Sequence, residues 1–422
     1  MRRKTGSTKK IRRRDSERRK TKDVPIEQLV LSADTAMASL DVEKAAQFYS
    51  QAAAKLRGST NQGDVMLLVL EKLGECSVSM GDQDGARQCF HDALSVLESI
   101  SQDTNSMAYH ETRSNLYLYT GQLSMGQEAL DSYLKGVHSL EACMTLLQKD
   151  TDATPESDGT EKILKQKLSG AYCTIAELFL TDLCFEDNAE TECESYIGKA
   201  LQITDDIDGE PLADALQTMA SLRLSQKPRQ MEAIAYIMRA YDKMKVGCEA
   251  LAILVGLSED AKDDVDDEQE SAFELKEVDA ANNLPEFEFR CQTAKLLLEC
   301  AALLRETQPA NNQEDRCLTA AISVLGSLLA QNDEVIEIWF LTGCAFAAKQ
   351  PPLVDAAKFH LDRAMEMLQD VKKALEQEVR FADEVDLSDL QGQMEENKVQ
   401  IEDVQAKLVE LGAELEESME EG

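Results

Sequence analysis

The sequence predicts an all-α protein built from stacked helical hairpins, and three observations lead to this prediction. The 422 residues include 8 Pro and 20 Gly, which is below the usual content of residues that break helices. Ala, Leu, Glu and Lys favour helices and are frequent, whereas apolar and polar residues rarely alternate as they do in strands. The third observation is a repeated spacing of small and aromatic residues, which is clearest between residues 73 and 93.

The segment with the clearest spacing reads LGECSVSMGDQDGARQCFHDA and matches a tetratricopeptide repeat. Only Gly or Ala fits at Gly74 and Ala86, where two antiparallel helices cross closely, and Phe90 fills the gap between neighbouring repeats. One hairpin cannot bury its apolar face alone, so copies stack into a superhelix whose groove is lined by the first helices. The sequence therefore predicts a tetratricopeptide-repeat superhelical solenoid of about seven helical hairpins, which acts as a binding scaffold.

The same register recurs, with departures, along residues 25-370, which we expect to form the solenoid. In the first hairpin Leu40 replaces the usual turn glycine, and in the third hairpin Tyr117 occupies the close-packing position. The register positions kept in the first, third and seventh hairpins are Ala33, Ala45, Tyr49 and Ala52; Ala129, Tyr133 and Gly136; and Trp339, Gly343, Phe346, Ala357, Leu361 and Ala364.

Three polar segments interrupt or precede the solenoid. Residues 1-24 form a basic tail with almost no apolar side chains, which we expect to be disordered. Residues 149-161 are polar and contain a proline, so they predict a loop between the third and fourth hairpins. Residues 258-285 form an acidic insertion, which is either a solvated linker or a flexible strap over a basic ligand.

Residues 371-422 repeat apolar residues every seven positions and predict an acidic heptad-patterned helix and tail. The main row is Leu387, Met394, Ile401, Leu408 and Leu415, and the second row of Leu390, Val404 and Leu411 is interrupted at Asn397 and Ser418. This helix either caps the apolar face of the last hairpin or associates with a second copy of the chain.

The charge of the chain is uneven. It carries 44 basic and 79 acidic residues, a net charge of −35. The first 22 residues contain twelve Lys or Arg and two acidic residues, a net charge of +10, so the remaining 400 residues carry −45. Such a body repels nucleic acid and membrane surfaces and attracts a basic protein, unless the acidity only keeps a long solenoid soluble.

The basic tail resembles a nuclear import signal, with clusters at residues 9–14 and 18–20. Contact with RNA or docking onto the acidic body would use the same charges. No run of 18 apolar residues occurs, and the start lacks the apolar segment of a secretory signal. We therefore expect a cytoplasmic and nuclear protein, with a nuclear import receptor among its partners.

The sequence lacks the motifs of an enzyme or a metal site. Its eleven Cys occur singly, as expected for small buried apolar residues in a reducing compartment, and its four His are not spaced as metal ligands. It has no phosphate-binding glycine loop and no nucleophile elbow. We expect no catalytic residues, no metal and no cofactor.

The groove is the expected binding site, because the first helix of each hairpin lines it. Outward positions on these helices are acidic, namely Asp34, Glu71, Glu75, Glu111, Asp182 and Glu337. Repeat proteins that hold the acidic C-termini of heat-shock proteins need Lys, Arg and Asn there, so the sign of the charge disfavours that function. Four aromatic residues are candidate anchors for a basic ligand, or alternatively pack between repeats: Phe179, Phe185, Phe289 and Trp339.

Three further stretches carry a more specific resemblance: AELFLTDLCFEDNAETECESYI from Ala176, ALQTMASLRLSQ from Ala215, and LPEFEFRCQTAKLLLEC from Leu284 with DEVIEIWFLTGCAF from Asp333. Together with the basic start, the acidic insertion and the acidic end, they resemble the eukaryotic assembly chaperones dedicated to large-subunit ribosomal protein four.

This resemblance implies a protein that captures the newly made ribosomal protein, shields its long basic internal loop and accompanies it to nuclear pre-60S assembly. The alternative is a histone chaperone built on the same repeat, although such a protein would carry its long acidic run inside an early repeat. A general adaptor without a basic client would bind its partners independently of salt, whereas both chaperones would bind less tightly at high salt.

Overall fold

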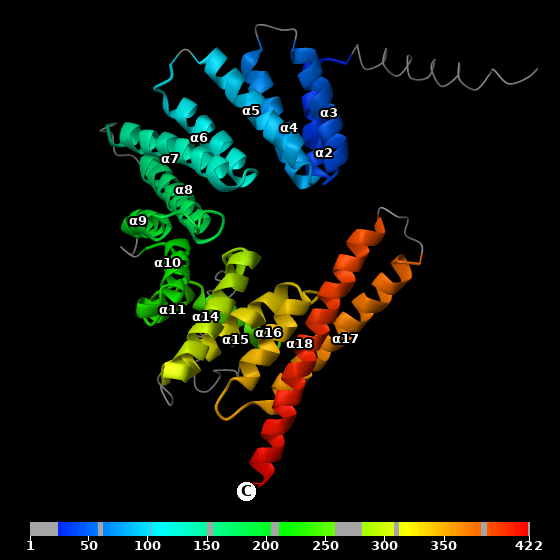
Figure 1. Cartoon of the computed structure of the whole chain (residues 1–422). Helices are drawn as coiled ribbons and strands as arrows, with labels where there is room; N and C mark the ends of the chain where they lie inside the picture. Colours follow the sequence, from blue (N-terminus) through cyan, green and yellow to red (C-terminus); the bar gives the residue numbers. More distant parts are fainter. Residues whose placement is uncertain are drawn as a thin grey trace, which may run out of the picture. The chain divides into compact units, whose positions relative to one another are not determined.

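The hairpins expected from the sequence are present in the computed structural model, which describes residues 24–57, 62–101, 103–149, 155–203, 211–257, 281–307, 312–380 and 386–420 (Figure 1). The regular elements of these residues are all helices, which confirms the predicted all-α class. The chain divides into two units, Met1–Glu210 and Pro211–Gly422. Residues 1–23 of the basic tail and residues 258–280 of the acidic insertion lie outside the described ranges.

Unit 1 contains four helical hairpins. Their helices are α2 (Ile26–Ala38) with α3 (Val42–Leu56), α4 (Gly63–Ser79) with α5 (Gln83–Ile100), α6 (Met107–Gln122) with α7 (Gly126–Lys149), and α8 (Pro155–Leu180) with α9 (Ala189–Gln202). Side-chain oxygens cap several helix starts: Asp82 accepts from the backbone N–H of Gly85 at 3.0 Å, and Ser106 from that of Tyr109 at 3.3 Å.

Close helix crossing explains the predicted register. A Cβ on Gly74 would lie 2.6 Å from Cε1 of Phe90, so only glycine leaves room for this fully buried ring. Phe90 also stacks on Tyr119 of the next hairpin, with ring centroids 5.1 Å apart. In the third hairpin Tyr117 fills the position equivalent to Gly74, and the ring of Tyr133 instead faces Gly121, where a Cβ would lie 2.9 Å away.

The turns of the first two hairpins share one backbone path but differ in sequence. Gly81 has a φ of +75° and donates to the carbonyl of Val78. Leu40 takes the same place after α2, with a φ of +57°, and donates to the carbonyl of Met37. A left-handed conformation costs a residue with a Cβ roughly 1–2 kcal/mol, so the substitution of leucine for glycine at this turn is unfavourable for folding.

The loop expected at residues 149-161 is shorter than predicted. Helix α7 continues to Lys149, and helix α8 begins at Pro155. The prediction took Pro155 as a loop residue, but proline is favoured in the first turn of a helix because its missing N–H would be unpaired there. Residues 150–154 lie outside the described ranges.

Unit 2 contains the three other predicted hairpins and additional helices. Its elements are α10 (Ala213–Ser225), the 3-10 turn η1 (Lys227–Arg229), α11 (Glu232–Asp242), α12 (Lys245–Leu254), α14 (Phe287–Thr307), α15 (Asn312–Gln331), α16 (Ile336–Ala347), α17 (Val354–Glu378) and α18 (Asp386–Glu420). Helix α12 was not expected. It packs on α15 so closely that a Cβ on Gly326 would lie 2.6 Å from the Cβ of Ala252.

Both borders of the acidic insertion contact one turn of α15. On one side, a Cβ on Gly326 would lie 3.3 Å from Cδ1 of Leu257. On the other side, the buried Arg290 donates through Nε to the carbonyl of Pro285 at 3.1 Å and through Nη1 to Oγ of Ser327 at 2.7 Å. Burial lowers the pKa of this guanidinium.

The C-terminal helix α18 packs back along α17. Val404 and Leu411 of the second heptad row are buried, and so is Asn397. The expected interruption at Asn397 is therefore part of the contact, because its Nδ2 donates to the carbonyl of Leu368 at 3.1 Å. Helix α17 itself ends at Glu378 rather than near residue 370, because its apolar row continues to the buried Leu375.

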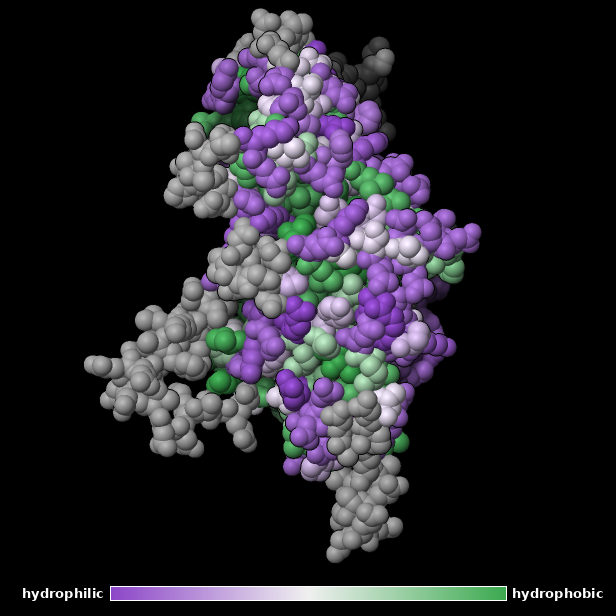
Figure 2. Space-filling view, turned by 90° about the vertical axis from the view of Figure 1, so that its left-hand side faces the viewer, coloured by the Kyte–Doolittle hydropathy of each residue, from purple (hydrophilic) through white to green (hydrophobic). Residues whose placement is uncertain are grey.

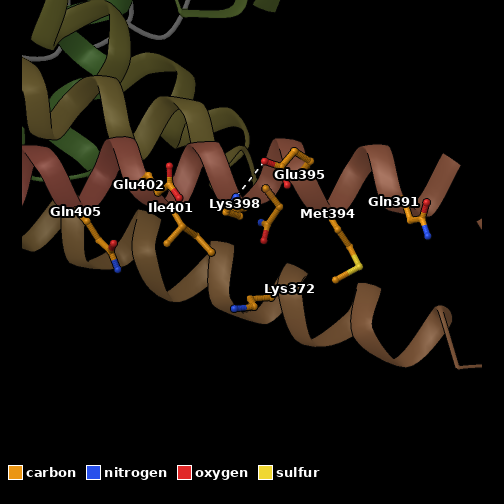
Figure 3. A pocket seen from close by; sticks show the side chains of 9 residues that line it. Lys372, Gln391, Met394, Glu395, Lys398, Ile401, Glu402 and Gln405 are labelled. Carbon is orange, nitrogen blue, oxygen red and sulfur yellow. Dashed lines mark hydrogen bonds and ion pairs between the residues drawn. The ribbon is translucent and has the colours of Figure 1, made fainter. Parts of the chain in front are cut away.

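The main heptad row of α18 is only half covered by this packing. Met394 and Ile401 line a groove of about 480 Å³ between α18 and α17, with Lys372 on the opposite wall (Figure 3). Lys398 on the rim pairs with Glu395 at 3.0 Å. The side chains of Leu387 and Leu415 lie outside the described residues.

Candidate partner-binding surface

Three of the predicted acidic residues, on the first helices α2 and α4, lie near two tyrosines: the buried Tyr49 of the second helix α3 and the half-buried Tyr119 of the first helix α6. The hydroxyl of Tyr49 donates to Oδ1 of Asp34, and burial, Asp34 and the more distant Glu75 all raise its pKa. Burial also raises the pKa of Tyr119, with added contributions from Glu75 and Glu71. We call this group of Asp34, Glu71 and Glu75 with Tyr49 and Tyr119 the acidic face of unit 1.

Glu71 and Glu75 differ in how well their charges are balanced. Nζ of Lys72 lies 2.8 and 3.1 Å from the two carboxylate oxygens of Glu75. Glu71 is half-buried, and its pKa is raised by burial and by the neighbouring Glu75, while Lys72 lowers it. Glu71 is thus a carboxylate whose ionised form is poorly stabilised in the free protein, and a cation placed beside it would stabilise that form.

Glu111 lies farther along the first helices. It is exposed on α6, with Oε1 3.6 Å from Nζ of Lys167 on α8. Lys167 also donates to Oδ1 of Asn115 at 3.4 Å. The charge of Glu111 is therefore partly balanced by a neighbouring hairpin.

Asp182 does not lie on a first helix, so its predicted placement is wrong. Helix α8 ends at Leu180, and the backbone N–H of Leu183 closes the helix end by donating to the carbonyl of Leu178 at 2.8 Å. Asp182 therefore lies in the α8–α9 turn, where Oδ2 accepts from the backbone N–H of Gly126 at 2.9 Å. Its carboxylate joins two neighbouring turns rather than facing a ligand beside the first helices.

The aromatic candidates of unit 1 have opposite environments. Phe179 is buried between α8 and α9 and stacks on Tyr196 with ring centroids 6.4 Å apart. Phe185 lies on the α8–α9 turn with 96% of its surface exposed. Phe179 is thus part of the core, and Phe185 is available to a partner but away from the first helices.

The candidates of unit 2 are engaged in packing and pairing. Glu337 is exposed and pairs with Lys295 of α14 at 2.8 Å. Trp339 is half-buried, donates from Nε1 to the carbonyl of Asp333 at 2.7 Å, and packs against His360 with ring centroids 5.5 Å apart. The half-buried Phe289 has its carbonyl bonded to Nε2 of Gln217 at 2.8 Å.

Among the candidates of unit 1, the structure thus gathers Asp34, Glu71 and Glu75. Sequence reasoning missed Tyr49 and Tyr119 as members of the acidic face, and Lys72 as the ion-pair partner of Glu75. A signal for Lys72 was present, because lysine three residues before Glu75 on a helix is spaced for an ion pair. One viewed face of the molecule is covered mostly by hydrophilic side chains with smaller hydrophobic patches (Figure 2).

Within the described residues, no group of three or more His, Cys, Asp or Glu side chains is placed to hold a metal ion. No helix in the same ranges is both long and apolar enough to span a membrane.

Comparisons with known proteins find a sequence relative and solved structures of similar fold. No protein-family model matches the chain. A Schizosaccharomyces pombe protein described as "Probable assembly chaperone of rpl4" is 32% identical over 275 residues, which are 65% of this chain and 61% of that relative. A solved structure described as "Assembly Chaperone of RpL4 (Acl4)", residues 1–338, matches with a TM-score of 0.52 and 22% identity over 76% of this chain and 95% of that one. The structural match supports the repeat fold.

Proposed function

We propose that this chain acts as an assembly chaperone of large-subunit ribosomal protein four, an assignment that the Schizosaccharomyces pombe relative supports and that the sequence resemblance predicted. It binds newly made ribosomal protein four, shields that protein's long basic internal loop on the acidic face of unit 1, and accompanies it to nuclear pre-60S assembly. The relation to chaperones and the helical repeat fold suggest a binding scaffold rather than an enzyme.

One observation carries this proposal: Asp34 of the first hairpin and Glu75 of the second both act on Tyr49, and the neighbouring Glu71 lacks full charge compensation. A basic segment without a fold of its own can pair its Lys and Arg heads with such carboxylates while its aliphatic stems pack on Tyr119 and nearby apolar side chains. Because an exposed ion pair contributes only about 0–1 kcal/mol, the affinity comes from many such contacts along the segment.

The localisation and the import step are part of the proposal. The basic residues before residue 23 have the composition of an import signal, so an import receptor is the proposed second partner. Cytoplasmic capture followed by nuclear delivery fits a protein that must keep a basic loop away from stray RNA until ribosomal RNA replaces the acidic face.

Binding of the full chain to three purified probes tests this function: ribosomal protein four, its isolated internal loop and core histones. We expect the protein and its loop to bind more tightly than histones, and the dissociation constant to rise steeply between 50 and 300 mM salt. Preference for histones would favour the histone-chaperone alternative, and affinity independent of salt would contradict both.

The raised pKa of Glu71 predicts that loop binding weakens in mildly acidic solution. Bound cations would lower this pKa, so binding releases a proton, and acidification through the raised pKa opposes it. The effect of pH on stability has the opposite sign. The pKa of Glu71 is higher in the folded than in the unfolded chain, so its contribution to the free energy of unfolding is present at low pH and is lost as the pH rises through the folded pKa. Calorimetry in two buffers of different ionisation enthalpy measures the proton release, which Glu71→Gln is expected to reduce. Equal release by both proteins would contradict the assignment.

A further inference from the structure

The turns between the first and second helices of unit 1 expose large apolar side chains. The exposed fractions are 87% for Leu40 after α2, 42% for Met80 after α4, 77% for Met125 after α6 and 96% for Phe185 after α8. Figure 1 shows the α2–α3, α4–α5 and α6–α7 turns along one side of unit 1, opposite the connections between hairpins. We call these four side chains the apolar turn edge.

The exposed leucine of the turn edge is not explained by a gain in folding stability. Leu40 has a left-handed backbone, and the equivalent turn of the second hairpin uses Gly81. Leucine therefore occupies a strained position and buries little surface in return. An exposed apolar side chain at a position that lowers folding stability indicates a contact with another molecule.

Phe185 and Met125 are presented by ordered, connected turns. The bond from Gly126 N–H to Asp182 joins the α6–α7 turn to the α8–α9 turn. Within the second turn, Cys184 N–H donates to the carbonyl of Thr181 and Glu186 N–H to that of Leu183. The turn thus fixes the backbone that carries the exposed phenyl ring, which favours its use as an anchor.

Carboxylates accompany these apolar side chains. Asp41 follows Leu40 directly, Asp82 follows the Met80 turn, and Glu186 and Asp187 follow Phe185; all four are exposed. A partner that fits this edge carries apolar pockets surrounded by basic side chains. A second copy of the chain would bring the same carboxylates against themselves, and like charges disfavour that pairing.

We propose that the turn edge docks the folded part of the same basic client whose internal loop lies on the acidic face. This inference rests on the proposed function and adds a second contact with a different chemistry: apolar side chains with a carboxylate rim. The client is then held at two places, and the two contacts strengthen each other because the second forms within the complex.

Binding of the variant Leu40→Gly/Met125→Ser/Phe185→Ser tests the proposal with three probes: intact ribosomal protein four, the same protein without its internal loop, and the isolated loop. We expect the variant to lose at least about tenfold in affinity for the first two probes and to bind the loop within about twofold of the wild type. The variant remains folded, because Leu40→Gly relieves strain and the other two side chains are largely exposed.

The matched control is Leu254→Ser/Val399→Ser/Val409→Ser, which removes three exposed apolar side chains from unit 2. It is expected to bind all probes as the wild type does. The proposal is overturned if the loop-deleted client does not bind the wild type, or binds the turn-edge variant equally well. Failure of the isolated loop to bind the wild type would instead remove the proposed function, so the two failures are distinguishable.

Discussion

Reversing the charges of Glu71 and Glu75 together to lysine is expected to weaken binding of the basic loop by about 30- to 100-fold. Each reversal removes an attraction and adds a repulsion, and surface pairs contribute about 0–1 kcal/mol each. Four such changes sum to about 2 to 3 kcal/mol, which corresponds to this range in dissociation constant. The variant should also show a smaller dependence of affinity on salt, because fewer ionic contacts remain to be screened.

The matched control for this prediction is Glu43→Lys/Glu98→Lys. Both residues are exposed on second helices, α3 and α5, and the substitution changes the net charge by the same amount. Titration calorimetry at fixed salt, with circular dichroism to verify the helix content, compares the two variants. If the control weakens binding as much as the Glu71/Glu75 variant, the effect is general attraction to an acidic body and the acidic face has no special role.

Replacing Phe90 by alanine is expected to lower the free energy of unfolding by about 3–5 kcal/mol, as for other fully buried phenylalanines. Its ring is completely buried, faces Gly74 within its hairpin and stacks on Tyr119 of the next one. The substitution therefore opens a cavity both inside a hairpin and between two hairpins. Because stability in repeat proteins depends on contacts between neighbours, the loss should extend to the α4–α5 and α6–α7 interface.

Urea unfolding of unit 1 within the full chain measures this loss, and hydrogen exchange locates it. Phe185→Ala is the control, since its 96% exposed ring contributes little to packing and the change should stay within about 0.5 kcal/mol. Equal destabilisation by the two substitutions would contradict the described difference in environment.

The fold was predictable from the sequence where a steric requirement fixes residue type. The Gly74–Phe90 pair is such a case, because only one small residue allows the ring to pack, and the pattern is then visible in the sequence. Helix α12 was not predicted because it is short and its contacts with α15 depend on residues far away in the chain. Asn397 was misread for a similar reason, since its partner is a backbone carbonyl on another helix.

The candidate site was less predictable than the fold. Register places a residue on a helix only as long as the helix continues, and α8 ends before Asp182. Aromatic residues are used both as core and as exposed anchors, and Phe179 and Phe185 are six residues apart with opposite exposure. The acidic residues that do gather, Asp34, Glu71 and Glu75, belong to regular stretches of α2 and α4, where helical spacing holds.

The contact of both insertion borders with one turn of α15 has a practical consequence. Leu257 packs beside Gly326, and Arg290 links the carbonyl of Pro285 to Ser327. The ends of the intervening segment are thus fixed by the surrounding helices, and the entropy of closing a loop rises by only about 0.6 kcal/mol for each doubling of its length. This position therefore suits the insertion of a protease site or a fluorescent domain, which would report on the protein in cells without separating α12 or α14 from α15.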